Sequence, residues 1–496
     1  MSAAGLVTGL AGQGTAGAAP PGRLPGRVPG PPRADDADWR WLRRHLSPKG
    51  RLYRPGEEPF EKLATPWNLR YADHRPAGIV ACATAADVQA AVRWARTCGM
   101  PLVPRSGGHN YAGYSTTPGL LISLRPMNEI ARRGDRLWVC GGATNADVFE
   151  SGARKTGLYV PGGRCMGVGV AGLTLGGGLG FNDRKWGLTC DRLVETEVVL
   201  ADGSLVRASR DECSDLFWAC RGGAGGNFGI NTGFLYDPVD VGRVAATVFE
   251  MSFALEEGVK VMRCLQHLLA EDDPEHDLDV RIEFGNPGTG PRGARLAVLG
   301  QYLGDKMTLY RRLQPLLRLR PRSCHIGTTG FWAAQKRLSM VSEHEAMTSR
   351  SLVPCRWLDD EAVCAIIEWI REWRPGRPGN TGYVTLFAMG GAIADLAPRA
   401  TAFPHRKATF VMDIGASWDN ACPDEVVDGL LAQTRAMHRC LSRLLGTRAA
   451  YVNFPDPDLP DWPTAYYGGN YRRLTQVKKR YDPDWVFRYP QGVRPY

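Results

Sequence analysis

The stretch Pro161–Gly180, PGGRCMGVGVAGLTLGGGLG, limits the fold most strongly, because ten of its twenty residues are glycine or alanine. Glycine loses more backbone entropy on folding than any other residue, and such a run cannot fill a core. It is typical of backbone that closely approaches a bulky ligand, often with N–H groups directed at phosphate. A second glycine turn, Arg105–Asn110 (RSGGHN), lies upstream. Each segment carries one reactive side chain, Cys165 and His109, so we expect the two segments to hold one large phosphate-bearing cofactor between them.

Length, composition and charge narrow the class of protein. A chain of 496 residues exceeds one hydrophobic core, so two or three domains are expected. No window approaches ~18 uninterrupted apolar residues, and we predict no membrane partner. The net charge of +10 is spread along the chain, without a basic block interleaved with aromatic residues. We therefore expect no nucleic-acid partner.

The cysteines and the N-terminus indicate the compartment. Thirteen scattered cysteines include no C-x-x-C pair, so we expect no metal site. Several cysteines lie in apolar stretches, as Cys82 does, and buried free thiols favour a reducing compartment. Residues 1–34 are rich in glycine, alanine and proline, which predicts a disordered tail. They contain neither a twin arginine nor an apolar segment of signal-peptide length, so a cytoplasmic location is expected.

Local patterns predict a β-α-β unit before the first glycine turn. We expect a strand over 76–83 and then a helix capped by Thr84, whose apolar positions recur at helical spacing until Gly99. A strand over 101–104 leads directly into the turn that carries His109. A loop at the end of a strand is a common place for a ligand site.

The same alternation continues downstream. A hairpin is expected around the turn Asp202-Gly203, and Asn145 is the expected cap of a helix that ends before Gly157. A third glycine loop spans 222–229 (GGAGGNFG). The remaining predicted elements of this half are strands over 120–124, 137–140 and 230–236 and a short helix over 214–220.

The spacing of apolar residues in the sequence changes after about residue 240. Apolar strands, as at 296–301 and 383–389, alternate there with long amphipathic helices, as at 256–269 and 424–445. This pattern predicts a second domain of mixed sheet and helices. The aromatic-rich C-terminal segment contains Tyr466–Tyr471 (YYGGNY), which we interpret as a loop that meets a ligand.

Residues Gly167–Gly172 match G-x-G-x-x-G, and Asp191 follows at a suitable distance for a nicotinamide-binding Rossmann site. That fingerprint should leave a strand and open a helix. Here PGGR precedes it and TLGGG, which we do not expect to be helical, follows it. The context therefore disfavours a Rossmann site.

Taken together, R-S-G-G-H-N, P-G-G-R-C-x-x-V-G and G-G-G-x-G resemble the berberine bridge enzyme-like flavin oxidases, part of the vanillyl-alcohol oxidase family with PCMH-type FAD-binding domains. The resemblance covers about residues 65–240. It resumes at Thr401–Arg406 (TAFPHR) and continues through Tyr451–Phe454 (YVNF) and Tyr467–Asn470 (YGGN) to the C-terminus. It implies an α+β fold: a two-part FAD-binding domain at 35–240 and, at 241–450, a substrate domain with an antiparallel sheet covered by helices. Residues 451–496 would return to the flavin domain.

The resemblance implies that FAD is bonded to both His109, at the 8α-methyl, and Cys165, at C6. A neutral imidazole and a thiolate are good nucleophiles toward an electron-poor ring. The resemblance also implies a wider set of FAD-binding residues, which are Arg105, Ser106, Gly107, Gly108, Asn110, Gly169, Gly176, Gly177, Gly225, Asn227, Gly229, Ile230, Asn453, Tyr467 and Asn470.

The reaction implied is hydride transfer from an alcohol or sugar carbon to flavin N5, which needs a base for the hydroxyl proton. Tyr451 resembles the catalytic tyrosine of the family, and strand alternation over 451–454 would place it beside Asn453. Tyr383 is the candidate for a second active-site tyrosine. Val168 matches the position that controls oxygen access, and its small volume favours O₂ as acceptor with release of H₂O₂.

Two other functions remain open at this point. The same flavin could close a ring in a natural product by taking hydride from a C–N or C–H carbon, or the scaffold could be a non-redox cyclase or binding protein with a structural flavin. The substrate is expected to be a small molecule, and the Arg/Ala/Gly-rich composition fits an enzyme of secondary metabolism by analogy only.

Overall fold

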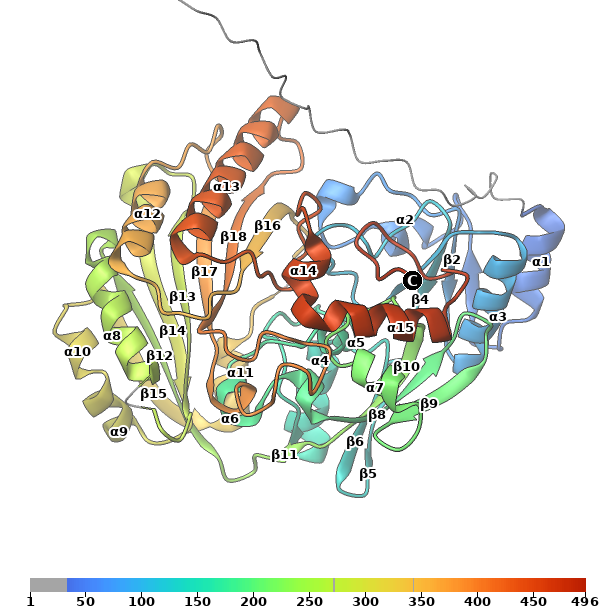
Figure 1. The fold of residues 1–496 in the computed structure, drawn as a ribbon, viewed down its shortest axis with the longest axis horizontal. Coiled ribbons are helices and arrows are strands. Elements are labelled where there is room, and N and C mark those ends of the chain that lie inside the picture. The colour runs from blue at the N-terminus through green and yellow to red at the C-terminus, as the bar shows by residue number, and fades with distance from the viewer. Residues whose placement is uncertain (1–33, 271–272, 342) are drawn as a thin grey trace, which may run out of the picture.

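A computed structural model describes residues 34–270, 273–341 and 343–496. Apart from residue 34, the tail expected at 1–34 lies outside the described residues. The described chain forms two halves (Figure 1). Residues of both halves line one cavity. The first half contains three small sheets, with four, five and two strands. The second half is built on one large antiparallel sheet.

The first sheet has four strands in the order β1-β2-β4-β3, of which β2, β4 and β3 are parallel. Helix α3 (Ala85–Thr97) connects β2 to β3, as the β-α-β pattern predicts. Thr84 caps this helix through a reciprocal pair of hydrogen bonds with Asp87. The other elements around this sheet are α1 (Asp36–Arg44), β1 (Arg51–Tyr53), α2 (Phe60–Ala64), β2 (Gly78–Ala81), β3 (Leu102–Arg105) and β4 (Leu120–Ser123).

The second sheet is antiparallel with the order β5-β6-β10-β8-β9, and the hairpin expected at Asp202-Gly203 joins β8 to β9. The helix expected from Asn145 begins there, but its cap is Thr144, whose hydroxyl accepts a hydrogen bond from Asp147 N. The elements are β5 (Ile130–Arg133), β6 (Arg136–Cys140), α4 (Asn145–Ser151), β7 (Leu158–Tyr159), α5 (Val170–Leu175), α6 (Asp183–Trp186), β8 (Leu193–Val199), β9 (Leu205–Ser209), α7 (Ser214–Ala219), β10 (Ile230–Tyr236) and β11 (Val239–Asp240).

The large sheet has seven strands in the order β15-β12-β14-β13-β17-β18-β16, all antiparallel. Helices cover one of its faces (Figure 1). The elements are β12 (Ala245–Phe253), α8 (Gly258–Ala270), β13 (Leu278–Asn286), β14 (Arg295–Tyr302), α9 (Lys306–Arg312), α10 (Gln314–Leu317), β15 (Ser323–Gly330), α11 (Phe331–Leu338), β16 (Ala346–Leu352), α12 (Asp360–Arg371), β17 (Thr381–Ala388), β18 (Phe410–Trp418) and α13 (Asp424–Leu445).

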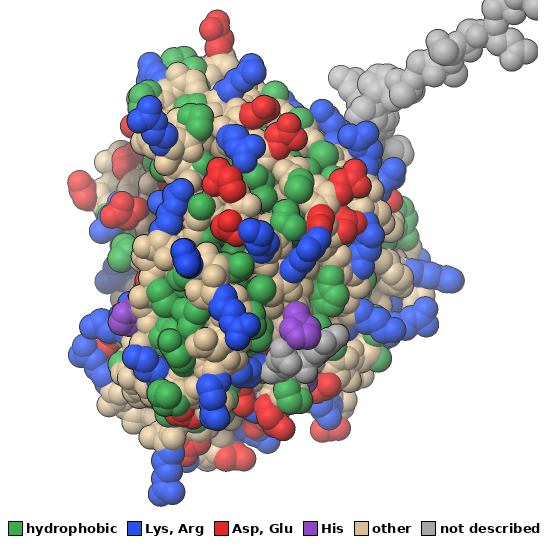
Figure 2. Space-filling view, turned by 90° about the vertical axis from the view of Figure 1, so that its left-hand side faces the viewer, with side chains coloured by type: hydrophobic (Ala, Val, Ile, Leu, Met, Phe, Trp, Pro, Cys, Tyr) green, Lys and Arg blue, Asp and Glu red, His purple; other side chains and the backbone are tan. Residues whose placement is uncertain are grey.

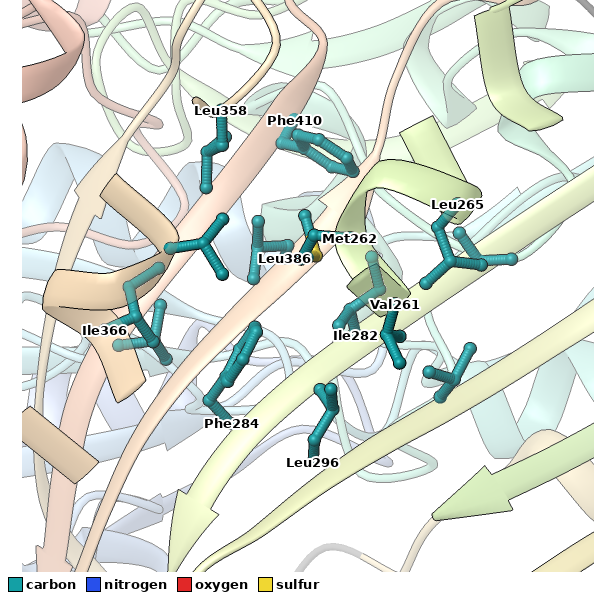
Figure 3. Close-up of a cluster of buried hydrophobic side chains, with 14 of the residues drawn as sticks. Val261, Met262, Leu265, Ile282, Phe284, Leu296, Leu358, Ile366, Leu386 and Phe410 are labelled. Atoms are coloured by element: carbon teal, nitrogen blue, oxygen red, sulfur yellow. The ribbon is translucent and has the colours of Figure 1, made fainter. Parts of the chain in front are cut away.

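Strand alternation gives this sheet two different faces. Ile282 and Phe284 of β13 point into the core beneath α8 and α12, where they pack among buried aliphatic side chains (Figure 3). Arg281 and Glu283, the intervening residues, line the cavity on the other face. Each fully buried aliphatic or aromatic side chain stabilises the fold by about 1.5–3 kcal/mol. The helix-covered face therefore anchors the sheet, and the opposite face presents polar groups to a ligand.

The outer surface of the helices over this sheet carries lysine and arginine side chains interspersed with acidic ones (Figure 2). On this face the positive charge is not gathered into a single block. That arrangement agrees with the spread of charge along the sequence.

The C-terminal segment crosses back to the first half of the molecule through α14 (Trp462–Tyr467) and α15 (Tyr471–Tyr481) (Figure 1). Tyr481 of α15 donates a hydrogen bond to Asp215, 2.8 Å away at the start of α7. Three sequence predictions are wrong here and in the glycine run. Residues 451–454 form a turn instead of a strand, 466–471 are helical instead of a loop, and α5 forms a short helix where the G-x-G-x-x-G context predicted none.

Candidate active site

One cavity of about 700 Å³ lies between the glycine loops and the polar face of the seven-stranded sheet. Its size falls within the range of ~300–1,000 Å³ that is usual for ligand sites. The three glycine loops, the turn at 451–454 and strands β13, β17 and β18 all contribute to its lining. The cavity thus joins segments that are far apart in the sequence.

The first two glycine loops touch through their backbones. A Cβ placed on Gly107 would lie 2.3 Å from the backbone N of Gly169, and one placed on Gly169 would lie 2.2 Å from the N of Gly107. No side chain fits in either position. Glycine is therefore required at both positions, and this contact closes one wall of the cavity.

Unsatisfied polar groups line the same wall. Ser106 Oγ and Arg105 Nη2 are buried and have no hydrogen-bond partner among the described residues. The rest of the Arg105 guanidinium donates to the carbonyl oxygens of Ser115 and Leu63, both at 2.7 Å, and burial lowers its pKa to about 10. Unpaired buried donors beside glycine backbone suit an anionic, hydrogen-bonding ligand. This wall fits the phosphate-bearing part of FAD.

His109 follows this loop and is held against Trp67. The two rings stack with centroids 4.8 Å apart and an angle of 19° between their planes. His109 Nδ1 lies 3.2 Å from the carbonyl oxygen of Gly107. Burial lowers the pKa of His109 to about 4, so the imidazole is neutral at physiological pH. A neutral ring is the nucleophilic form of histidine.

Cys165 lines the cavity together with His109. Burial raises the pKa of its thiol, whereas the neighbouring charges of Arg281 and Arg164 act in the opposite direction. The turn after Cys165 is fixed by its carbonyl oxygen, which accepts hydrogen bonds from Asn145 Nδ2 at 2.9 Å and Val168 N at 3.2 Å. That turn places Val168 in the cavity wall as well.

Tyr451 is buried, and its phenol oxygen accepts two hydrogen bonds. The donors are Gly178 N at 3.0 Å and Asn453 Nδ2 at 3.1 Å. Burial raises the pKa of Tyr451, and the hydrogen bond from Gly178 opposes that shift. Asn453 reaches Tyr451 through the tight turn that Phe454 N closes onto Tyr451 O, at 2.9 Å, and not through strand alternation. Two donors aimed at one phenol oxygen stabilise its deprotonated form.

The large sheet contributes Tyr383 and an acid that the sequence argument missed. Asp413 of β18 is buried and accepts a hydrogen bond from Ser349 Oγ at 2.5 Å, and burial raises its pKa to about 6. It pairs in register with Thr385, two residues along β17 from Tyr383. A lone aspartate in the apolar strand FVMDIGASW was the signal that could have identified it.

Comparison with known proteins identifies the family. The family described as FAD binding domain matches residues 76–209, and the family described as berberine and berberine like matches residues 450–494. An uncharacterized FAD-linked oxidoreductase of Bacillus subtilis, YgaK, is 32% identical over 90% of this chain and 97% of its own length. The chain belongs to the berberine bridge enzyme-like family.

Solved structures of this family share the fold. Physcomitrella patens BBE-like 1 superimposes with a TM-score of 0.82 at 25% identity, covering 92% of this chain and 99% of its own. The glucooligosaccharide oxidase of Acremonium strictum, whose flavin is 6-S-cysteinyl, 8α-N1-histidyl FAD, has a TM-score of 0.79 at 26% identity, covering 90% of this chain and 97% of its own. This berberine bridge enzyme-like protein is thus an FAD-linked oxidoreductase with the expected α+β fold.

The cavity brings together most of the residues that the sequence singles out for this BBE-like protein. Those that line it are Arg105, Ser106, Gly107, Gly108, His109, Asn110, Cys165, Val168, Gly169, Gly225, Gly229, Ile230, Tyr383, Tyr451 and Asn453.

Five others, Gly176, Gly177, Asn227, Tyr467 and Asn470, are not part of the lining. Asn227 donates to Gly223 O at 2.7 Å, and Asn470 donates to Pro398 O at 2.8 Å. Tyr467 donates to Gly223 O at 3.3 Å. These three polar side chains therefore bond to backbone carbonyls within the protein, and Tyr467 and Asn470 lie in the helical segment that the sequence predicted as a loop.

Two further structural findings bear on the sequence predictions. Within the part of the chain that the structure describes, no helix is long and apolar enough to cross a membrane. Over those same residues, no group of three or more His, Cys, Asp or Glu side chains could hold a metal ion.

Proposed function

We propose that this BBE-like protein is an oxidase that takes hydride from the hydroxyl-bearing carbon of an alcohol or sugar, including one carried by a secondary metabolite, with FAD attached to both His109 and Cys165. The observation that carries the proposal is that these two nucleophiles line one cavity beside two glycine loops in backbone contact. The flavin of the Acremonium strictum enzyme has the same two kinds of linkage.

The residues of the first half would hold the cofactor. Ser106 and Arg105 offer unpaired donors, and the glycines of the three loops let backbone N–H groups come close to phosphate. Gly225, Gly229 and Ile230 extend this wall. Neutral His109 and the Cys165 thiol, which lies beside two guanidinium groups, are suited to bond the ring.

When bound, FAD supplies a two-electron acceptor whose reoxidation by O₂ yields H₂O₂. Tyr451 would accept the proton of the substrate hydroxyl, and the N–H groups of Gly178 and Asn453 offset part of the rise in its pKa that burial causes. Tyr383 lines the sheet side of the cavity, where it would orient the substrate. Val168, a small side chain in the wall, would leave room for O₂.

The proposal is tested by peptide mapping of acid-denatured holoenzyme together with anaerobic substrate reduction. His109→Ala and Cys165→Ala should each lose one flavin linkage and keep the other, and the double variant should release its FAD. Val168→Leu should slow reoxidation without slowing anaerobic reduction. Retention of only one linkage in the parent protein would contradict the bicovalent assignment.

The same assays separate this proposal from the two alternatives. Bleaching of the flavin by simple alcohols or sugars, with peroxide formed on readmission of air, supports alcohol oxidation. A flavin that bleaches only with a natural product, without alcohol oxidation, supports ring closure. A bound flavin that no such compound bleaches supports a non-redox role.

A further inference from the structure

Two arginines on the substrate side of the cavity have hydrogen-bond donors that no described group satisfies. Arg164, next to Cys165, and Arg281 of β13 both line the cavity, and the Nε atom of each is buried without a hydrogen-bond partner among the described residues. Each guanidinium carries five N–H donors and keeps its charge at all physiological pH values. A buried N–H donor without an acceptor is costly.

The contacts that these two guanidiniums do make leave most of their donors unused. Arg164 Nη1 donates one long hydrogen bond, 3.4 Å, to the carbonyl oxygen of Leu338. The Arg281 guanidinium lies over the ring of Phe387, 4.9 Å from its centroid. Arg281 Nη2 forms an ion pair with Glu283 Oε2 at 3.7 Å, a separation too long for a hydrogen bond. Both guanidiniums therefore keep N–H donors without an acceptor at the cavity wall.

The two charges also act on each other. Burial lowers the pKa of Arg164 to about 10, and the charge of Arg281 lowers it further. Glu283 balances part of this charge through its ion pair with Arg281. Burial raises the pKa of the other two nearby acids, Asp413 and Glu345, so their contribution weakens as the pH falls. Cys165 could supply negative charge as a thiolate, but a thioether to the flavin carries none. A carboxylate ligand would supply hydrogen-bond acceptors to the guanidinium donors that these acids leave unpaired.

From this geometry we infer that Arg164 and Arg281 form an anion-recognition site, and that the substrate of this enzyme carries a carboxylate in addition to the group that is oxidised. The inference rests on the proposed function, since it concerns the substrate of the flavin site. The planar fork of arginine matches a carboxylate in bidentate geometry, and a charge-assisted pair is about twice as strong as a neutral hydrogen bond. Tyr111 and Phe454, which stack 5.5 Å apart in the same cavity, offer faces for an unsaturated or ring-shaped body.

The test uses holoenzyme and a matched pair of probes that contain no oxidisable alcohol, benzoate and benzamide. Binding is followed through the change that each probe causes in the visible spectrum of the bound flavin. Benzoate should bind at least about tenfold more tightly than benzamide, as one net charge-assisted interaction allows. Arg281→Met and Arg164→Met should each abolish most of this selectivity, and Arg281→Lys should retain part of it. Arg311→Met, which removes an exposed charge from α9, should leave the selectivity unchanged.

Two results would overturn the inference. Benzoate could bind no more tightly than benzamide, or not at all up to its solubility limit. Alternatively, Arg281→Met could reduce the attachment of flavin to Cys165, seen in the mass of the Cys165 peptide, and leave the selectivity for benzoate unchanged. In that case the guanidiniums serve flavin attachment instead. A protein without any flavin spectrum after FAD is supplied would refute the proposed function itself, and peptide mapping of the same sample distinguishes that case.

Discussion

The contact between the first two glycine loops leads to a quantitative prediction. A Cβ on Gly107 would approach the backbone N of Gly169 to 2.3 Å, whereas ordinary van der Waals contact begins at 3.4 Å. The two loops must therefore separate by roughly 1 Å, and both contacting groups are backbone. Overpacking of this kind costs about 1–3 kcal/mol, and we expect the upper part of that range because no flexible side chain can yield.

The assay combines urea unfolding of the purified Gly107→Ala variant with its FAD content. We expect the free energy of unfolding to fall by about 2–3 kcal/mol and most of the FAD to be lost, because the loops form the cofactor wall. Gly429→Ala is the matched control: Gly429 lies in α13 with nothing within 4 Å of the added Cβ. This control should be stabilised by about 0.5–1 kcal/mol. Full flavin content and a change below about 0.5 kcal/mol in Gly107→Ala would refute the reasoning.

Three further predictions concern the cavity. Tyr451→Phe should lower the rate of anaerobic flavin reduction about 10²–10⁴-fold while FAD stays attached, as for a lost general base, and an unchanged rate would exclude that role. Burial raises the pKa of Asp413 from 3.8 to about 6, so the folded state holds a proton that the unfolded state loses between these pH values. Stability should therefore fall by about 2–3 kcal/mol as pH rises from 4 to 6 and stay lower above it, a dependence that urea unfolding should find missing in Asp413→Asn. Trp67→Ala should reduce the fraction of His109 peptide that carries flavin, whereas Trp67→Phe should preserve it, and equal fractions in both variants would show that stacking does not position the imidazole.

Local sequence rules predicted the elements that local interactions determine. The cap at Thr84 and the turn at Asp202-Gly203 satisfy their hydrogen bonds within a few residues, so spacing alone locates α3 and the β8–β9 hairpin. The glycine turn with His109 also follows its strand as expected. For such segments tertiary packing adds little to the choice of conformation.

Elsewhere the local conformation depends on contacts between residues that are distant in the sequence. The pair Gly468-Gly469 suggested a loop, but packing of α14 and α15 against the first half keeps the chain helical through it. Four residues at 451–454 fit a turn as well as a strand. Hydrogen bonds with residues far away in the sequence fix their place, such as those of Tyr451 with Ser351 and Gly178, 100 and 273 residues away. Asp413 depends on Ser349, 64 residues away, and on burial beneath the cavity. No local pattern contains such information.

The central claim, that His109 and Cys165 hold one flavin between them, is tested most directly by the mass of proteolytic peptides from acid-denatured holoenzyme. The account predicts one FAD that remains bound after denaturation and crosslinks the His109 peptide to the Cys165 peptide, with the crosslink lost in either single alanine variant. Release of free FAD from the denatured parent protein, or FAD attached at neither residue, would contradict it.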